Sequence, residues 1–277
     1  MKIIKTVDEF LGWRGQQSNS IGFVPTLGAL HDGHSSLIKA SKKKCKNTVV
    51  SIFLNPTQFA PNEDLDAYPN TLDQDINNLK SLNVDILFVP NETEMYQTVG
   101  DVDIPVSGLF NKLEGKSRPH FFYGVTTIVA KLFNVIKPTH AFFGEKDAQQ
   151  LIIITEMIAV MKYSIKMVAC PTIRDKNGLA LSSRNSYLTE REKKQAAIIY
   201  RSLMQIKEGL KQGDSSLENL KNVFRKNIAT NDNMKIDYIS IANINTLDEI
   251  TIIQEQKILV STAIFFNEVR LIDNFIY

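Results

Sequence analysis

The chain contains few of the residues on which metal and redox proteins depend. Only 2 of its 277 residues are cysteine, and the separation of Cys45 from Cys170 matches no zinc or redox motif. We expect both to be reduced thiols in or beside the core. Histidine is also scarce, with 4 residues in the chain, yet His31 and His34 stand three residues apart. This pair is therefore the first feature that needs an explanation.

Long apolar runs and an excess of one charge are absent too. No stretch approaches the roughly 18 uninterrupted apolar residues of a membrane-spanning helix, and residues 1–8 hold no apolar segment typical of a secretory signal. The 32 basic and 30 acidic residues leave a net charge of +2, which gives no electrostatic case for a nucleic-acid binder. We expect a cytoplasmic protein whose partners are small molecules, neither nucleic acid nor membrane.

Two common nucleotide-binding patterns are missing. The lack of a Gly-x-x-x-x-Gly-Lys-Ser/Thr loop excludes a Walker-type ATPase, and the lack of a Gly-x-Gly-x-x-Gly turn counts against an NAD-dependent dehydrogenase. The chain does have a hydrophobic fraction of 43%, which is enough to build a full core. Its length suits one large domain or two smaller ones.

Short apolar runs alternate with segments of helical spacing in the first part of the chain. Near-continuous apolar runs are typical of parallel strands that are covered on both faces. Their alternation with helices predicts an α/β fold with a Rossmann-like, doubly wound parallel sheet. Strands are expected at residues 21–24, 48–54, 84–89, 140–143 and 165–169, and helices at residues 37–41, 72–79, 125–136 and 151–161.

The patterning changes after a turn-rich stretch at residues 174–178. Thr189, with Glu192 three residues on, has the pattern of a helix N-cap, and a second helix is expected to begin around residues 214–216. Strand-like runs follow at residues 236–241, 257–266 and 269–272. The sequence thus predicts a Rossmann-like domain over residues 1–173, followed by a smaller α+β domain over residues 174–277 that acts as a lid.

The segment His31-Asp32-Gly33-His34 stands where a buried strand is expected to pass into a helix. Histidine donates hydrogen bonds or carries positive charge near neutral pH, and a helix N-terminus adds N–H groups and the positive end of a dipole. The combination suits a phosphate whose negative charge grows during reaction. Two histidines beside a turn can equally be helix caps, and the tetrapeptide alone favours that plainer interpretation.

Three further polar loops follow predicted strands, at residues 55–59, 144–147 and 179–185. Each alone can be an ordinary turn or helix cap. Four such loops at the carboxyl ends of parallel strands favour a functional site, because doubly wound proteins bind ligands there. The residues suited to nucleotide phosphates are Gly28, His31, Gly33, His34, Lys146, Ser182, Ser183 and Arg184.

Five segments together resemble one family closely. They are Pro-Thr-Leu-Gly-Ala-Leu-His-Asp-Gly-His-Ser-Ser-Leu at 25–37, Asn-Pro-Thr-Gln-Phe at 55–59, Tyr-Pro-Asn-Thr at 68–71, Phe-Gly-Glu-Lys-Asp-Ala-Gln-Gln at 143–150 and Gly-Leu-Ala-Leu-Ser-Ser-Arg-Asn at 178–185. In order and spacing they are similar to the pantoate–β-alanine ligases, up to about residue 190. The first segment alone indicates only the wider nucleotidyltransferase superfamily.

The resemblance implies an AMP-forming carbon–nitrogen ligase, a cytoplasmic homodimer that condenses pantoate with β-alanine and uses ATP and Mg²⁺. It implies catalytic roles for His34, His31, Lys146, Ser182, Ser183 and Arg184. It implies ATP binding by Leu27, Gly28, Ala29, Leu30, His31, Asp32, Gly33, His34, Gly144, Glu145, Lys146, Asp147, Ile173, Leu181, Ser182, Ser183 and Arg184. Pantoate is expected at Gln58 and Gln150, with β-alanine near Gln58.

Some positions depart from the family pattern. Leu27 and Leu181 replace methionine, and Ile173 replaces valine, at sites where the backbone is expected to bind. Residues 118–124 are Arg-Pro-His-Phe-Phe-Tyr-Gly where the family has Arg-Pro-Gly-His-Phe-x-Gly. The role of this loop is therefore open, and we assign no function to His120.

The sequence leaves the metal ligands and two rival functions open. Asp73 and Asp75 lie near the relevant loop, but helix carboxylates are more often solvated than ligands. His140 is expected to end a strand rather than to do chemistry.

A nucleotidylyltransferase that moves AMP or CMP onto a phosphorylated acceptor would use the same loops, although it needs neither glutamine and makes no amide. A catalytically inactive nucleotide-binding regulator is the third hypothesis.

Overall fold

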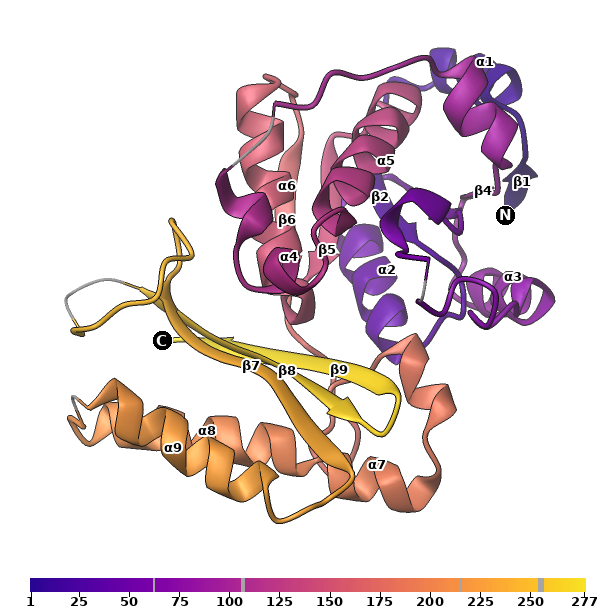
Figure 1. The fold of residues 1–277 in the computed structure, drawn as a ribbon. Coiled ribbons are helices and arrows are strands. Elements are labelled where there is room, and N and C mark those ends of the chain that lie inside the picture. The colour runs from indigo at the N-terminus through magenta and orange to yellow at the C-terminus, as the bar shows by residue number, and fades with distance from the viewer. Residues whose placement is uncertain (62, 106–107, 215, 254–256) are drawn as a thin grey trace. The chain divides into compact units, whose positions relative to one another are not determined.

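The chain forms two compact units in a computed structural model that describes residues 1–61, 63–105, 108–214, 216–253 and 257–277 (Figure 1). The first unit comprises residues 1–110, 118–145 and 150–171, and the second comprises residues 111–117, 146–149 and 172–277. The second unit thus includes two short segments that lie far before its main part in the chain, residues 111–117 and 146–149. Ser215, part of an expected helix start, lies outside the described residues.

A six-stranded parallel sheet forms the centre of the first unit, in the order β1-β4-β3-β2-β5-β6. The strands are β1 (Lys2–Ile4), β2 (Ile21–Thr26), β3 (Asn47–Ile52), β4 (Ile86–Phe88), β5 (His140–Gly144) and β6 (Lys166–Cys170). The predicted doubly wound class is confirmed, and the strands expected from the apolar runs correspond to β2 through β6.

Helices connect these strands, and short turns of helix occur in the loops. The helices are α1 (Val7–Gly15), α2 (Asp32–Lys44), α3 (Leu72–Ser81), α5 (Phe121–Ile136) and α6 (Ala148–Val160). The short turns are η1 (Pro56–Gln58), η2 (Glu94–Thr98), η3 (Gly108–Asn111), α4 (Glu114–Ser117) and η4 (Glu145–Asp147).

Both faces of the central strands β2, β3 and β4 are covered, which explains why these strands are mostly apolar in sequence. Val24 packs with α2 and α3 in one buried cluster. Its neighbour Phe23 points to the other face and meets Phe133 of α5, with ring centroids 6.2 Å apart. On that same side the ring centroid of Phe10 in α1 lies 4.8 Å from the ring centroid of Phe88 in β4.

The strand order reverses beside β2. The chain adds β3 and β4 on one side of β2 and then returns to add β5 and β6 on the other. In doubly wound sheets, ligands bind outside the carboxyl ends of the strands at such a reversal. The segment with His31 and His34 directly follows β2, so the fold puts the histidine pair at this switch point.

The second unit is built on a three-stranded antiparallel sheet of β7 (Met234–Asn243), β8 (Ile258–Phe266) and β9 (Val269–Ile276). Its helices are η5 (Ser183–Tyr187), α7 (Glu190–Ala196), α8 (Ile198–Lys211) and α9 (Leu217–Ile228). An apolar cluster that includes Leu203, Phe224, Val260 and Ile264 joins α8 and α9 to one face of the sheet. The expected α+β architecture of this part is confirmed.

The predicted helix start at Thr189 is present. The Thr189 hydroxyl accepts from the Glu192 N–H at 3.3 Å, and the Glu192 carboxylate accepts from the Thr189 N–H at 2.8 Å. The helix expected there is, however, divided at Ala197 into α7 and α8. The second expected start is present as well, because the Ser216 hydroxyl caps α9.

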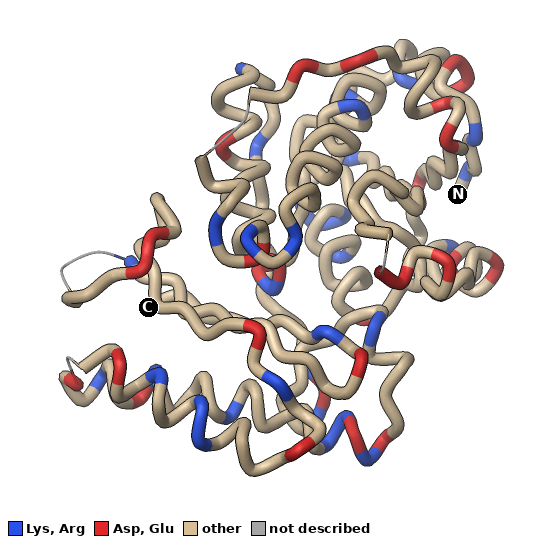
Figure 2. Tube along the Cα trace, in the orientation of Figure 1, with Lys and Arg blue, Asp and Glu red and all other residues tan. Residues whose placement is uncertain are grey.

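Surface charge and cysteine environment agree with the composition. Basic and acidic residues are interspersed along the trace of both units (Figure 2), and among the described residues no helix is long and apolar enough to cross a membrane. Cys45 and Cys170 are buried free thiols. Burial raises the pKa of both thiols, which makes them poor nucleophiles.

Candidate active site

Both histidines cap the start of α2. Nδ1 of His31 accepts a hydrogen bond from the Gly33 N–H at 3.1 Å, and Nδ1 of His34 accepts from the His31 N–H at 3.3 Å. A neutral imidazole that accepts at Nδ1 carries its proton on Nε2. Each ring is thereby a donor through its Nε2–H. The capping and phosphate-binding interpretations are compatible, because the cap is what orients the two donors.

The His31 cap leaves no room for a side chain at position 33, which explains the glycine there. A Cβ at position 33 would lie 2.6 Å from Cε1 and 2.8 Å from Nδ1 of His31. Any side chain would therefore push the ring out of its capping position. The sequence placed this glycine among the residues suited to nucleotide phosphates, and the structure adds that it makes room for the His31 ring.

The loop before the histidines is held by Asp75 of α3. Its carboxylate accepts from the N–H groups of Ala29 and Leu30 at 2.9 Å each, and from the Thr71 hydroxyl at 3.1 Å. Asp75 is only 1% exposed, so the expectation of a solvated carboxylate is wrong for this residue. One signal was available, since Asp75 is one turn before the buried Leu79 on the inner face of α3.

The hydrogen bonds to Asp75 also stabilise an unfavourable backbone conformation at Ala29. Ala29 adopts a φ of +52°, in the left-handed region that non-glycine residues seldom occupy. Such a residue costs on the order of 1–3 kcal/mol and persists only when its surroundings hold it. The hydrogen bond from the Ala29 N–H to Asp75 provides part of that support.

Gln58, in the loop after β3, is oriented by Asn55. The Asn55 amide donates to Oε1 of Gln58 at 3.2 Å and to the carbonyl of Gly124 at 3.2 Å. Its oxygen accepts from the hydroxyls of Thr57 and Tyr96, and Asn55 is 0% exposed. Because the Gln58 amide oxygen is engaged, its NH₂ group is the part that can donate to a ligand carboxylate or hydroxyl.

Gly124 of α5 lets this loop pack closely on the helix. A Cβ at position 124 would lie 2.4 Å from the carbonyl oxygen of Thr57. A larger residue would therefore displace the backbone that carries Gln58. Gly124 ends the atypical 118–124 segment, and its position explains why a glycine occurs there.

The atypical segment also holds the Gln58 loop through Arg118. The guanidinium donates to both carboxylate oxygens of Glu63 at 2.5 Å and to the Gln58 carbonyl at 3.2 Å. It stacks 3.8 Å from the centroid of the Phe121 ring, at the position where the family has histidine. His120 is exposed and makes no side-chain cap to α5.

The remaining predicted donors belong to the second unit. Lys146 lies in η4, with its ammonium 3.5 Å from the Asp147 carboxylate and its side chain 17% exposed. Ser182 caps η5, since its hydroxyl accepts from the Arg184 N–H at 3.3 Å. A hydroxyl that accepts in a cap still has its O–H to donate. The capping interpretation of Ser182 therefore leaves room for phosphate binding.

The predicted site residues are divided between the two units. Those in the first unit are Leu27, Gly28, Ala29, Leu30, His31, Asp32, Gly33, His34, Gln58, Gly144, Glu145 and Gln150. Those in the second unit are Lys146, Asp147, Ile173, Leu181, Ser182, Ser183 and Arg184. Ile173 and Leu181 meet through a backbone hydrogen bond of 2.9 Å. Gln150 is half-buried, whereas its neighbour Gln149 is buried and donates to the Lys112 carbonyl.

His140 lies away from these loops. It is the first residue of β5, at the end of the strand that the sequence predicts over residues 140–143. It is therefore at the amino-terminal edge of the sheet, and Nδ1 is 3.0 Å from the Thr139 hydroxyl. Burial, with Lys44 and Lys166 nearby, lowers its pKa. These features leave His140 outside the candidate site.

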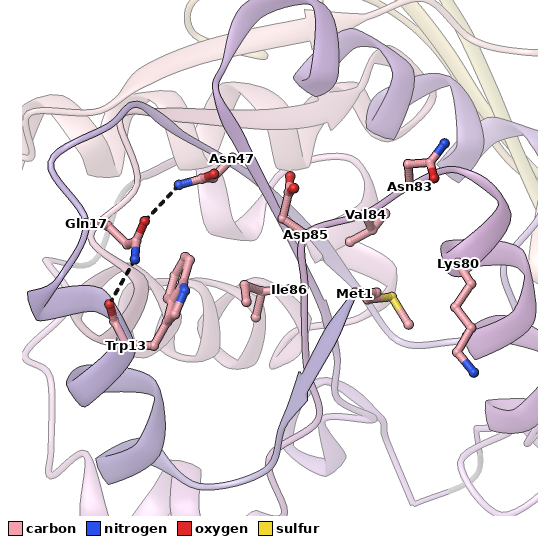
Figure 3. Close-up of a pocket in the computed structure, with 9 residues that line it drawn as sticks. All are labelled: Met1, Trp13, Gln17, Asn47, Lys80, Asn83, Val84, Asp85 and Ile86. Carbon is pink, nitrogen blue, oxygen red and sulfur yellow. Dashed lines mark hydrogen bonds between the residues drawn. The ribbon is translucent and has the colours of Figure 1, made fainter.

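A pocket of about 440 Å³ opens at the same amino-terminal edge (Figure 3). It is lined by Met1, Trp13, Gln17, Asn47, Lys80, Asn83, Val84, Asp85 and Ile86. The Gln17 amide accepts from Asn47 at 3.2 Å and donates to the Trp13 carbonyl at 3.5 Å. The pocket contains none of the predicted site residues. In the described part of the chain, no group of three or more His, Cys, Asp or Glu side chains is arranged to hold a metal ion.

A doubly wound sheet with a His-x-Gly-His helix start at its switch point defines an α/β protein of the Rossmann-like class. Comparison with known proteins identifies the family within this class. The sequence profile of the Pantoate-beta-alanine ligase family matches residues 2–276, and the chain belongs to that family.

Relatives and solved structures agree over the whole chain. Pantothenate synthetase of Acetivibrio thermocellus is 42% identical over 279 residues, which cover 100% of this chain and 99% of the relative. Pantoate–β-alanine ligase of Saccharomyces cerevisiae is 41% identical over 309 residues, covering 100% of each. The chain is therefore a ligase.

Two crystal structures are similar in fold. Pantothenate synthetase from Thermus thermophilus superposes with a TM-score of 0.90 at 36% identity, over 99% of both chains. The Francisella tularensis ligase, complexed with beta-gamma ATP and β-alanine, gives a TM-score of 0.80 at 39% identity, over 99% of this chain and 97% of that one. The likeness covers both units.

Proposed function

We propose that the protein condenses pantoate with β-alanine to pantothenate, cleaving ATP to AMP and pyrophosphate, with a pantoyl adenylate as intermediate. Membership of the ligase family over residues 2–276 supports the overall reaction. The observation that carries the site assignment is the pair of capped imidazoles at the switch point, whose Nε2–H donors suit a phosphate.

In the first step, a pantoate carboxylate oxygen attacks the α-phosphorus of ATP. The bond from that phosphorus to the bridging oxygen breaks, and pyrophosphate leaves. Because negative charge grows on the phosphate oxygens, catalysis depends on positioning and on preorganised donors. We assign this role to His31 and His34, together with Lys146 and residues 182–184.

In the second step, the neutral β-alanine amine attacks the acyl carbon of the adenylate. The bond from that carbon to the AMP oxygen breaks, AMP leaves, and the nitrogen releases a proton to give the amide. Water must be kept out, because it would hydrolyse the activated acyl group. We assign pantoate binding to Gln58 and Gln150, and a lid function to residues 174–277. The mechanism needs no covalent enzyme intermediate, which suits a chain whose two thiols are buried with raised pKa values.

Mg²⁺ is proposed to enter bound to the triphosphate of ATP. At nucleotide sites Mg²⁺ usually takes only one or two protein carboxylates and fills its shell with phosphate oxygens and water, so a cluster of protein ligands is not required. When bound, it would neutralise phosphate charge.

We further propose a cytoplasmic homodimer, as in the family that the sequence resembles, and light scattering on the purified protein measures the mass that tests the dimer.

The deciding assay follows product formation from ATP, pantoate and β-alanine. We expect pantothenate and AMP in equal amounts, with pantothenate formed only when β-alanine is present. Pantoate alone should support exchange of labelled pyrophosphate into ATP, because the first step does not need the amine. Transfer of AMP or CMP to a phosphorylated acceptor, without amide formation, would favour the nucleotidylyltransferase hypothesis instead.

Gln58→Ala is expected to weaken pantoate binding far more than ATP binding. A hydrogen bond to a charged group contributes about 1.5–3 kcal/mol, so the KM for pantoate should rise by about tenfold or more. The KM values for both substrates are measured in the exchange assay. Gln74→Ala, at an exposed position of α3, is the control. Equal losses for pantoate and ATP would show that Gln58 does not line the pantoate site.

A further inference from the structure

Two neighbouring residues of β9, Asp273 and Asn274, hold the two segments of the second unit that carry its predicted phosphate donors. The Asn274 amide donates to the carbonyl of Lys146 at 2.7 Å. The Asp273 carboxylate forms a bidentate ion pair with Arg174, with N–O distances of 2.6 and 2.8 Å. Asp273 is 4% and Asn274 9% exposed. Neither residue was singled out in the sequence.

The side chains of these neighbours leave β9 on opposite faces of the strand. On the side of Asp273, the Arg174 guanidinium lies 3.8 Å from the ring centroid of Tyr200 in α8. On the side of Asn274, Arg270 forms an ion pair of 2.5 Å with Glu114. One face thus carries the helices, and the other binds the two short segments, residues 111–117 and 146–149, through polar side chains.

The ion pair of Asp273 fixes the turn that leads to Ser182. Arg174, gripped by Asp273, also donates to the Gly178 carbonyl at 3.1 Å. At the base of the same turn the Leu181 N–H donates to the Ile173 carbonyl at 2.9 Å. The next residue along the chain is Ser182, the cap of η5. Asp273 therefore sets where the predicted phosphate-binding loop begins.

We propose that Asp273 and Asn274 are positioning residues that fix Lys146 and residues 182–184 relative to each other within the second unit. The inference rests on the proposed function, which gives those donors their phosphate-binding role. Donors aimed at developing charge lose much of their effect when they are displaced, and an error of about 1 Å can cost about 10²-fold in rate. The C-terminal sheet would thus align donors, in addition to the lid function that we propose for residues 174–277.

Asn274→Asp tests this role with a side chain of the same size. A carboxylate cannot donate to the Lys146 carbonyl and is repelled by it, so η4 should shift. We expect the kcat of pantoate-dependent exchange to fall by about tenfold to 10²-fold, with little change in the KM for pantoate, whose proposed ligands lie in the first unit. Asn222→Asp is the matched control, since Asn222 is exposed and its oxygen accepts from Arg225.

A double-mutant cycle separates positioning from general destabilisation. If Asn274 acts through Lys146, Asn274→Asp should lower kcat little further in a Lys146→Ala background, because the displaced donor is already absent. A purely structural role would give the full loss in both backgrounds and overturn the inference. Thermal unfolding is followed for every variant, and Asn274→Leu, which removes the donor without adding charge, gives the same test if Asn274→Asp does not fold.

The inference and the proposed function fail in different ways. Wild-type kcat in Asn274→Asp would overturn the inference while β-alanine-dependent pantothenate formation by the wild-type protein stands. Asp273→Asn is expected to lower kcat as well. The fall in kcat that it causes should be smaller in an Arg184→Ala background. A wild-type protein that makes no pantothenate would overturn the proposed function itself.

Discussion

His34→Ala is expected to lower the rate of pantoate-dependent exchange of pyrophosphate into ATP by about 10²–10³-fold. The substitution removes an Nε2–H donor from the place where we propose that charge develops, and it removes the acceptor for the His31 N–H. The fold should survive, because the His31 cap of the Gly33 N–H remains and loss of one cap costs only about 0.5–2 kcal/mol.

The control for this variant is His120→Ala. His120 is exposed and makes no side-chain cap, so its loss should leave exchange near the wild-type rate. Thermal unfolding of both variants checks that they are folded. Near-normal exchange in folded His34→Ala would remove His34 from the chemistry. The capped pair would then be a structural feature of α2, as the tetrapeptide alone had suggested.

Much of the fold was predictable because the first sheet is buried on both faces. Successive residues such as Phe23 and Val24 both enter a core, so β2 appears in the sequence as a continuous apolar run. β1 could not be recognised in the sequence, because it has only three residues and depends on pairing with β4, which begins more than 80 residues later. The inclusion of residues 111–117 and 146–149 in the second unit rests on long-range polar contacts and left no local pattern.

The predicted site residues are those with a strong local sequence pattern. His34 and Gln58 stand in short segments of unusual composition, and the loops follow recognisable strands. Residues that act by holding such segments were missed, because their partners are far away along the chain. Asp75 is 45 positions from Leu30, and Asn274 is 128 from Lys146. Their contributions appear only once the chain has folded.

Asp75→Asn is expected to impair the loop at the switch point without changing any residue that we assign to substrate. The carboxylate accepts from Ala29, Leu30 and Thr71. An amide has only one accepting atom, so its NH₂ group must face a backbone N–H, and a buried donor is left unpaired at a cost of about 1–3 kcal/mol. The free energy of unfolding should fall by about this amount, as measured by urea denaturation.

Activity should fall with the geometry of the loop. Residues 27–30 precede the capped histidines, so a displaced backbone shifts the ATP-binding segment, and we expect kcat/KM for ATP to drop by about tenfold to 10²-fold. The KM for pantoate should change less, because Gln58 is held separately by Asn55. Asp73→Asn makes the same chemical change two residues away in α3, at an exposed position. If both variants have the same kcat/KM for ATP, Asp75 does not position the loop, and Ala29 keeps its left-handed backbone by other contacts.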